Sequence, residues 1–205
     1  IDIVPVESAL RDDERSARYG HSGAVLWLTG LPGSGKSTIA QALERKLFNR
    51  GGSPVFLDGD TLRAGLNGDL GFSPKDRSEN IRRLAEVATH LARNGHIAIV
   101  AAVSPSADDR AQARRTAADA FREIFVATPR EVCEGRDPKG HYAKARAGTL
   151  TNFTGTGSDY EKPDAPELTL DTTARSAADL AGDVEQMLAK TGILSAEPAD
   201  IAANI

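Results

Sequence analysis

The chain has very little cysteine. Cys133 is the only cysteine among its 205 residues, so an internal disulfide is excluded, which suits a reducing compartment. The four histidines, at positions 21, 90, 96 and 141, match no metal-ligand spacing. We therefore expect Cys133 to be a small core residue, and we assign no chemistry to the histidines.

Long apolar runs and an excess of positive charge are also missing. No run approaches the ~20 residues that a membrane-spanning helix needs, and no secretory signal peptide is visible. The 25 Lys and Arg residues against 29 Asp and Glu give a net charge of −4. We therefore expect neither a nucleic-acid nor a membrane partner, and we expect a cytoplasmic protein. Because the first residue is Ile rather than Met, we expect a fragment or a trimmed chain.

What the chain does have is a glycine-rich stretch near its beginning. The apolar run Val25–Thr29 predicts a buried strand, and a helical pattern begins directly after Ser37. Between them, the letters GLPGSGKS fit the phosphate-binding pattern G-x-x-x-x-G-K-[ST] in full. The residues assigned to a nucleoside triphosphate are Gly30, Gly33, Ser34, Gly35, Lys36, Ser37 and Thr38.

Each part of this loop has a physical role. Glycines let successive backbone N–H groups turn toward an anion, and the following helix adds the positive end of its dipole. We expect Lys36 to reach the β- and γ-phosphates and the Ser37 hydroxyl to bind Mg²⁺. A glycine-rich turn without a ligand is the alternative, and the complete motif with its strand and helix argues against it. The loop predicts a bound triphosphate but not the reaction.

Strands and helices alternate along the rest of the chain. Further strands are predicted at Pro54–Leu57, Ile97–Val103, Glu123–Ala127 and Glu167–Leu170, and helices at 61–66, 74–94, 106–120, 128–135 and 176–190. The expected caps of the last four helices are Ser73, Ser106, Thr128 and Ser176. This alternation predicts an α/β fold, a three-layer α/β/α arrangement of the P-loop NTPase type with a mainly parallel five-stranded sheet. We expect one domain at 23–192, with an N-terminal arm or linker at 1–22 and a C-terminal tail at 193–205.

Polar residues follow two of the predicted strands. The turn Asp58-Gly59-Asp60 ends the second strand, with Arg63 close behind it, and Ser104 closes the third. Ligands of open α/β sheets bind at the carboxyl ends of the strands. Asp60 is therefore a candidate to accept a proton from an acceptor hydroxyl or to orient a hydrated Mg²⁺, while Asp58 could hold the turn. An Asx turn with a surface ion pair, and a cap hydroxyl for Ser104, remain the alternatives.

A second group follows at the start of the long predicted helix. Arg77 and Asn80 are three residues apart and share a helix face. Arg77 can bind an anionic group through two hydrogen bonds, and Phe72 can stack on a base. Charged first turns are common, so this group is weak evidence by itself.

The segment 136–157 shows no clear periodicity and is rich in Gly, Lys and Arg. Loops of this length in compact domains are usually functional or disordered. Its cations, together with Phe153, favour a lid that closes over phosphates and excludes water. A disordered surface loop is the alternative.

In these stretches the sequence resembles the adenylyl-sulfate kinase (APS kinase) family. The resemblance covers about Gly20–Lys190. It rests on WLTGLPGSGKST, LDGDTLRAGLNGDLGFSPKDRSENIRRLAEVA, Val103-Ser104-Pro105, RDPKGHYAKARAG, and NFTG followed by DYEKP. Members of this family transfer the γ-phosphoryl group of MgATP to the 3′-hydroxyl of adenosine 5′-phosphosulfate (APS) in sulfate assimilation. The product is 3′-phosphoadenylyl sulfate (PAPS). The resemblance implies the same activity here, with ATP and Mg²⁺.

The resemblance also implies roles for individual residues. Lys36, Asp60 and Ser104 become candidate catalytic residues, and Arg136 joins the loop on the ATP side. The APS side is implied for Asp60, Arg63, Phe72, Arg77, Asn80, Val103, Ser104, Lys139, Phe153 and Thr154. The two phenylalanines are expected to sandwich the adenine of APS. Some bacterial members carry a phosphoserine at the Ser104 position. We do not expect one to be obligatory here, because direct in-line transfer is simpler.

The sequence departs from the family pattern at two points. Pro32 stands where Ser is common, which removes one backbone N–H from the loop, and Thr61 stands where Asn is common. The N-terminal arm resembles the segment that joins this domain to an ATP sulfurylase subunit in fused bacterial proteins. We therefore expect fusion to or association with ATP sulfurylase. We also expect a homodimer. The alternatives are a P-loop kinase for another small acceptor and a non-catalytic, nucleotide-dependent regulatory domain.

Overall fold

The computed structural model describes residues 8–149, 153–154 and 160–195. Its strands are β1 (Ala24–Thr29), β2 (Pro54–Asp58), β3 (Ile97–Ala101), β4 (Phe121–Val126) and β5 (Leu168–Leu170). They form one sheet of order β2-β3-β1-β4-β5, and all four pairings are parallel. This confirms the predicted fold class. Parts of the predicted arm, lid and tail, at 1–7, 150–152, 155–159 and 196–205, lie outside the described residues.

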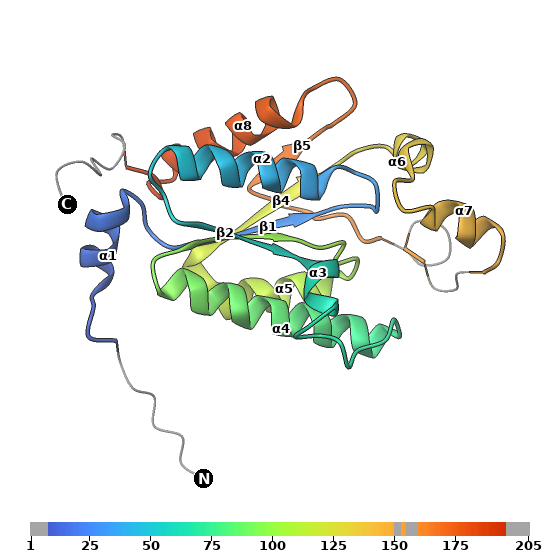
Figure 1. Cartoon of the computed structure of the whole chain (residues 1–205), viewed down its shortest axis with the longest axis horizontal. Helices are drawn as coiled ribbons and strands as arrows, with labels where there is room; N and C mark the ends of the chain where they lie inside the picture. Colours follow the sequence, from blue (N-terminus) through green and yellow to red (C-terminus); the bar gives the residue numbers. More distant parts are fainter. Residues whose placement is uncertain (1–7, 150–152, 155–159, 196–205) are drawn as a thin grey trace, which may run out of the picture.

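Helices cover both faces of this sheet. The helices of the described residues are α1 (Asp12–Tyr19), α2 (Lys36–Asn49), α3 (Gly59–Arg63), α4 (Pro74–Arg93), α5 (Ala107–Ala117), the 3-10 helix η1 (Ala118–Ala120), α6 (Arg130–Arg136), α7 (His141–Arg146) and α8 (Ala177–Lys190). In Figure 1, α2 and α8 lie on one face, and α4 and α5 on the other. Within the described residues, no helix combines the length and the apolar character that crossing a membrane requires.

The central strand β1 is buried on both faces. Leu26 and Leu28 join the apolar cluster shared with α2 and α8, whereas Val25 and Trp27 join the cluster shared with α4 and α5. Successive side chains of a strand point to opposite faces, so a continuous apolar run is what a strand between two helix layers requires. The phosphate-binding loop therefore begins at the carboxyl end of the most enclosed strand.

Serine side chains cap the first turns of the two helices α4 and α8, as predicted. Ser73 caps α4 by accepting a hydrogen bond from the Asp76 backbone N–H (3.2 Å), and Pro74 occupies the first helical position. Ser176 caps α8 in the same way, from Asp179 N–H (3.1 Å). Such caps satisfy N–H groups that have no partner within the helix.

Two predicted boundaries near the site were wrong. Strand β3 ends at Ala101 rather than Val103, because the Thr29 hydroxyl takes the Val103 carbonyl (2.8 Å) out of the strand ladder. Helix α3 begins at Gly59 rather than Thr61, because the Asp58 carboxylate accepts from the two backbone N–H groups that open the helix.

Two other predicted ends were also displaced. Helix α5 stops at Ala117, where Ala118 turns the chain with a φ of +48°, and the 3-10 helix η1 continues the helical stretch to Ala120, as predicted. Strand β4 begins at Phe121, two residues before the predicted strand. Thr128 does not cap α6. Its hydroxyl donates instead to the Ser34 carbonyl of the phosphate-binding loop (2.9 Å), and Pro129 occupies the cap position without a side-chain hydrogen bond.

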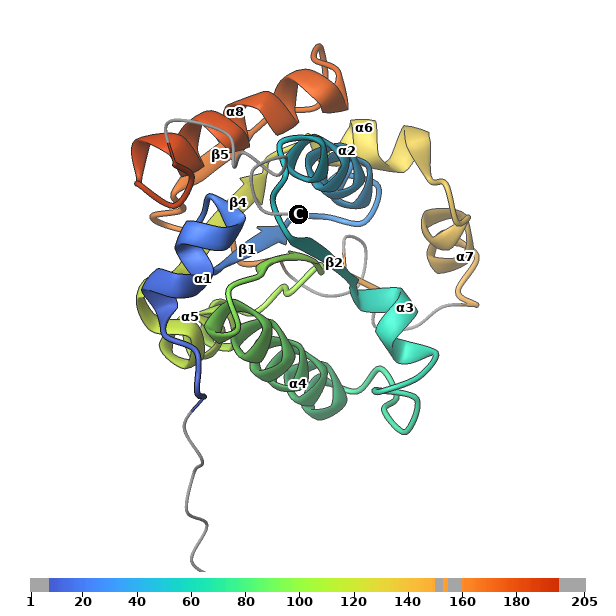
Figure 2. The ribbon, with the colours of Figure 1, turned by 60° about the vertical axis from the view of Figure 1, so that its left-hand side comes forward.

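We predicted no periodic structure for 136–157, and this prediction is wrong for the first part of the stretch. After α6 the chain forms α7, and the Asp137 carboxylate accepts from the backbone N–H groups of Tyr142 (3.1 Å) and Ala143 (3.0 Å). Gly140, with a φ of +66°, makes the turn into the helix. Figure 2 shows α3 and α7 at the same end of the molecule. The lid prediction therefore falls partly on a capped helix.

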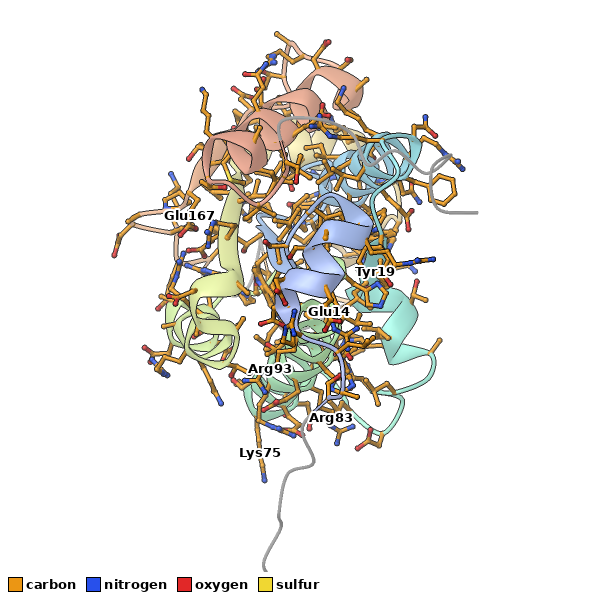
Figure 3. All side chains as sticks on the ribbon, turned by 90° about the vertical axis from the view of Figure 1, so that its left-hand side faces the viewer. Glu14, Tyr19, Lys75, Arg83, Arg93 and Glu167 are labelled. Atoms are coloured by element: carbon orange, nitrogen blue, oxygen red, sulfur yellow. The ribbon has the colours of Figure 1, made fainter. Side chains whose placement is uncertain are left out.

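The amino ends of the strands are covered by α1. Figure 3 looks at this end, with Tyr19 labelled on α1. The Tyr19 ring stacks on the buried His21 ring, with 5.8 Å between ring centres. His21 pairs with Leu194 in an antiparallel bridge, and Ile193 and Leu194 are buried in the core. The residues that flank the predicted domain at 23–192 thus pack against it.

His21 should make the fold less stable in mild acid. Its Nε2 accepts from the Ser53 backbone N–H (2.9 Å) and its Nδ1 faces the Ser22 carbonyl (3.0 Å), an arrangement that requires the neutral ring. Burial lowers its pKa below the ordinary 6.5. The stabilisation is therefore complete above pH 6.5 and lost as the pH falls through the folded-state pKa. Between pH 7 and 5, the urea midpoint should fall further for wild type than for His21→Gln, whose amide oxygen can still accept from Ser53. Equal falls would contradict this.

Candidate active site

A cleft of about 1000 Å³ opens at the carboxyl ends of the strands. The phosphate-binding loop, α3, the start of α4, the chain after β3 and the α6–α7 region all line it. Of the predicted site residues, the lining includes Gly33, Gly35, Lys36, Ser37, Thr38, Asp60, Arg63, Phe72, Arg77, Asn80, Val103, Ser104, Arg136, Lys139, Phe153 and Thr154. Gly30 and Ser34 do not line it. The structure therefore brings together residues that are more than a hundred positions apart in the chain.

The phosphate-binding loop is packed tightly against its surroundings. Gly33 has a φ of +78°, and a Cβ there would stand 2.8 Å from the Cys133 carbonyl oxygen, so only glycine fits. The buried Ser34 presents its carbonyl to the hydroxyls of Thr128 (2.9 Å) and Thr172 (3.0 Å). Thr128 was predicted only as a helix cap, and Thr172 was not predicted at all. Both follow strand ends, of β4 and β5, and that position was the available signal.

Lys36 is folded back onto the loop that carries it. Its ammonium donates to the backbone carbonyls of Gly30 (2.9 Å) and Leu31 (2.8 Å). Burial lowers the pKa of Lys36 to about 8, although the charges of Asp58 and Asp60 oppose the shift. The Ser34 hydroxyl is a third, more distant partner (3.4 Å). A buried cation whose hydrogen bonds go to neutral groups is poised to gain a stronger, anionic partner.

A hydroxyl and a carboxylate meet beside the loop. The Ser37 hydroxyl donates to Asp58 Oδ2 (3.1 Å), while Asp58 Oδ1 accepts from the backbone N–H groups of Asp60 (3.1 Å) and Thr61 (3.0 Å). Asp58 thus holds the turn, as predicted. Within the described residues, no group of three or more His, Cys, Asp or Glu side chains could hold a metal alone. Hard oxygen ligands from one hydroxyl and one carboxylate fit Mg²⁺, which usually shares its remaining positions with water and phosphate.

Asp60 and Lys139 form an ion pair across the cleft. Asp60 lies in the first turn of α3, and Lys139 lies between α6 and α7. Both side chains remain more than half exposed, and the pairing raises the pKa of Lys139. The predicted lid cation therefore contacts the predicted acceptor-side carboxylate directly.

Two guanidinium groups face the cleft from the acceptor side. Arg63 lies 4.5 Å over the Phe72 ring and donates to the Gly71 carbonyl (2.8 Å). Arg77 donates to the Thr154 hydroxyl (2.7 Å), and its pKa is lowered by burial and by the charge of Arg63. Two cations so close together favour an anionic partner.

The two predicted aromatic residues line the cleft but differ in exposure. Phe72 is 64% exposed, whereas Phe153 is buried and packs edge-on against Tyr142, with 4.9 Å between ring centres. The Tyr142 hydroxyl donates to the Pro32 carbonyl (3.0 Å), which links α7 to the phosphate-binding loop. Tyr142 was missed because nothing in its local sequence shows a contact 110 residues away. Stacking of a base between Phe72 and Phe153 stays a prediction.

Ser104 is buried and its hydroxyl already has partners. It accepts from the Trp27 indole N–H (3.0 Å) and donates to the Thr29 hydroxyl (3.0 Å). Its φ of +39° is held in part by the buried Arg110, which donates to the Ser104 carbonyl (2.7 Å) and pairs with Glu123 (2.8 Å). This network supports the expectation that a phosphoserine is not obligatory. A catalytic role for Ser104 stays a prediction.

Arg136 lines the cleft on the side of the phosphate-binding loop. Its guanidinium donates to the Thr172 hydroxyl (2.7 Å) and to the Thr172 carbonyl (2.8 Å). Those bonds tie the end of α6 to the chain after β5. The position suits the ATP-side role that was predicted for it, which remains a prediction.

A model of the adenylylsulphate kinase family matches residues 22–171. The chain belongs to this family. The matched range contains the phosphate-binding loop, the carboxylate turn and both arginines of the acceptor side. This APS kinase domain is therefore an ATP-dependent kinase with a P-loop fold.

Individual relatives support the same family. The adenylyl-sulfate kinase of Clostridium acetobutylicum is 51% identical over 83% of this chain and 85% of that protein. The bifunctional enzyme NodQ of Azospirillum brasilense is 53% identical over 93% of this chain but only 31% of its own length. A structure of the Mycobacterium tuberculosis APS kinase CysC in complex with AMPPNP and APS has a TM-score of 0.80 and 53% identity, over 82% of this chain and 99% of that chain. The APS kinase domain thus spans most of a stand-alone relative and about a third of a bifunctional one.

Proposed function

We propose that the APS kinase domain transfers the γ-phosphoryl group of ATP to the 3′-hydroxyl of APS, giving PAPS and ADP. The observation that carries this proposal is a single cleft in which a phosphate-binding loop faces a carboxylate and two arginines. The mycobacterial relative, whose structure is described with both AMPPNP and APS, supports the same pairing of donor and acceptor.

The residues of the loop fit the donor. Backbone N–H groups of 33–38 and the start of α2 would hold the phosphates, with Arg136 on the same side. Ser37 and Asp58 would hold Mg²⁺, which neutralises phosphate charge when it is bound. Lys36 would leave the two carbonyls it now contacts and donate to the β- and γ-phosphates.

The opposite side of the cleft fits the acceptor. Arg63 and Arg77 would bind the phosphosulfate, because planar guanidinium groups match the oxygens of such anions. Phe72 and Phe153 would cover the adenine. Val103, Ser104, Lys139 and Thr154 complete this side of the proposed site.

Asp60 would act on the 3′-hydroxyl. The bond from the 3′-oxygen to the γ-phosphorus forms as the bond to the β–γ bridging oxygen breaks, and the hydroxyl proton passes to the Asp60 carboxylate. Lys36 and Lys139 stabilise the negative charge on the transferred group. Positioning and electrostatics supply most of the catalysis, since such transfers need little covalent chemistry from the protein.

We also propose that the domain at 23–192 works with an ATP sulfurylase subunit, either fused or associated. The bifunctional relative, of which this chain spans 31%, supports a fused partner. A homodimer and a cytoplasmic location belong to the same proposal. Size-exclusion chromatography with light scattering tests the dimer.

ATP binding should take up protons through Lys36. Burial lowers the pKa of Lys36 to about 8, and phosphates beside the ammonium would raise it. Affinity for ATP should therefore fall as the pH rises through 8. Calorimetry at pH 8, in two buffers of different ionisation enthalpy, should show net proton uptake by wild type and less by Lys36→Met. Equal uptake by both proteins would show that another group is responsible.

An acceptor screen by coupled ADP release tests the proposed function. We expect ADP formation with APS and little with a nucleoside monophosphate or a sugar. Turnover of one of those acceptors but not of APS would favour a different small-molecule kinase. ATP binding without ADP formation for any acceptor would favour a regulatory domain.

A further inference from the structure

Two buried amide side chains meet behind the acceptor side of the cleft. Asn67 lies in the turn between α3 and α4 and is 0% exposed, and Asn80 lies on α4 and is 6% exposed. The Asn67 Nδ2 group donates to Asn80 Oδ1 (3.0 Å). Asn80 lines the cleft, whereas Asn67 does not. Asn67 therefore touches the site only through its neighbour.

This hydrogen bond determines which end of the Asn80 amide faces the cleft. A carboxamide has an acceptor oxygen and a donor nitrogen, and Asn67 occupies the oxygen. Within the described residues, Asn80 Nδ2 donates to no protein group. Asn80 also follows Arg77 by one helical turn on the same face. An N–H donor here adds to the cationic character of the acceptor side, whereas a carbonyl oxygen would repel an anion.

The orientation of the Asn67 amide leaves one of its own polar atoms unsatisfied. Its backbone is fixed in the turn, with Asn67 N–H donating to the Leu62 carbonyl (2.9 Å) and its own carbonyl accepting from Leu70 N–H (3.1 Å). Within the described residues, its buried Oδ1 has no hydrogen-bond partner. A buried acceptor without a partner destabilises the fold and calls for an explanation. Fixing the orientation of Asn80 supplies one.

We propose that Asn67 is a positioning residue that holds the Asn80 amide with its N–H toward the anionic part of the acceptor. This inference rests on the proposed function. It assigns to Asn67 no contact with substrate or reacting atoms. Its effect should appear in acceptor binding and not in ATP binding.

Asn67→Asp tests the polarity of the pair with almost no change of shape. An ionised carboxylate can only accept, so Asn80 must turn Nδ2 toward it and present Oδ1 to the cleft. At pH 8 the KM for APS should rise about tenfold or more, while the KM for ATP stays within about twofold. Burial raises the pKa of such a carboxyl, and its protonated form can donate again. The KM ratio of variant to wild type should therefore fall toward one as the pH is lowered to 6.

Asn94→Asp is the matched control. Asn94 ends α4 away from the cleft, and its amide donates to the His90 carbonyl (2.8 Å). This variant adds the same charge without touching the amide pair, so its KM for APS should stay at the wild-type value at every pH.

A double-mutant comparison shows whether Asn67 acts through Asn80. Asn67→Ala should raise the KM for APS by about threefold in the wild-type background, without pH dependence. It should have no further effect in an Asn80→Ala background. This pair of variants also keeps the test decisive if Asn67→Asp does not fold.

Three results would overturn the inference. They are an unchanged KM for APS in folded Asn67→Asp, equal rises in the KM for APS and for ATP, and a full Asn67 effect that persists without the Asn80 amide. Wild-type protein with no turnover of APS would count against the proposed function. Wild-type turnover combined with any of the three results would count against the amide pair alone.

Discussion

Replacing Asp60 by Asn should lower kcat by at least about 10²-fold, the usual contribution of a positioned general base. The Asp60 side chain lines the cleft and is 66% exposed to solvent. It stands on a turn that the Asp58 carboxylate holds by two backbone hydrogen bonds. Asn keeps the size and polarity of the side chain, but it cannot accept the proton of the acceptor hydroxyl. Affinity for ATP should stay within about twofold, because Asp60 acts on the acceptor.

Steady-state kinetics with APS and calorimetry with ATP together check this prediction. Asp69→Asn is the matched control, since Asp69 is also an exposed carboxylate in an ion pair, with Arg83 (2.7 Å), and lies outside the cleft. Its kcat should match that of wild type. A wild-type kcat in Asp60→Asn would rule out Asp60 as the catalytic base.

Lys36→Met should weaken ATP binding and slow phosphoryl transfer together, with a loss in kcat/KM of about 10²- to 10³-fold. Lys36 is a buried cation of the phosphate-binding loop, and its ammonium donates to neutral groups, the carbonyls of Gly30 and Leu31 and the Ser34 hydroxyl. Removing it leaves the charge on the transferred group without its nearest protein cation. Met preserves most of the apolar stem, so the fold should persist.

The control for this variant is on the same helix. Lys46→Met removes a lysine of α2 that pairs with Glu185 (3.0 Å) on the α8 side, outside the cleft. It should leave both ATP affinity and kcat unchanged. Similar losses in the two variants would indicate damage to α2 rather than a role for Lys36 in transfer.

The sequence allowed prediction of the parts of the site that depend on short-range pattern. The phosphate-binding loop follows β1 because a complete motif stood between an apolar run and a helical one. Asp60 and Ser104 were found by their places after β2 and after the β3 run, since parallel strands bring their carboxyl ends to one edge. The caps Ser73 and Ser176 gave helix starts that the structure confirms.

What the sequence could not show depends on contacts between distant segments. The hydrogen bond from the Tyr142 hydroxyl to the Pro32 carbonyl joins residues 110 positions apart, and no local sequence pattern predicts it. Strand β3 ends earlier than predicted because the Thr29 hydroxyl on β1 donates to the Val103 carbonyl. Helix α7 was missed because its cap, Asp137, lies outside the usual cap position.

Asn67 illustrates the same limit within the site. Asn, Gly and Asp in its stretch favour a turn, and a turn residue is ordinarily exposed. Its burial and its bond to Asn80 follow from the packing of that turn against α4. Only the folded chain shows that this amide contacts Asn80.

The position of the transferred phosphoryl group distinguishes transfer to the 3′-hydroxyl of APS from every alternative. ATP labelled at the γ-phosphorus should be incubated with the protein and APS, and the nucleotide product should be isolated and its site of phosphorylation identified. We expect label on the 3′-oxygen of the nucleotide, with one ADP formed per label transferred, and no product from an APS analogue that lacks the 3′-hydroxyl. Label at another position, or label released only as inorganic phosphate, would contradict this expectation.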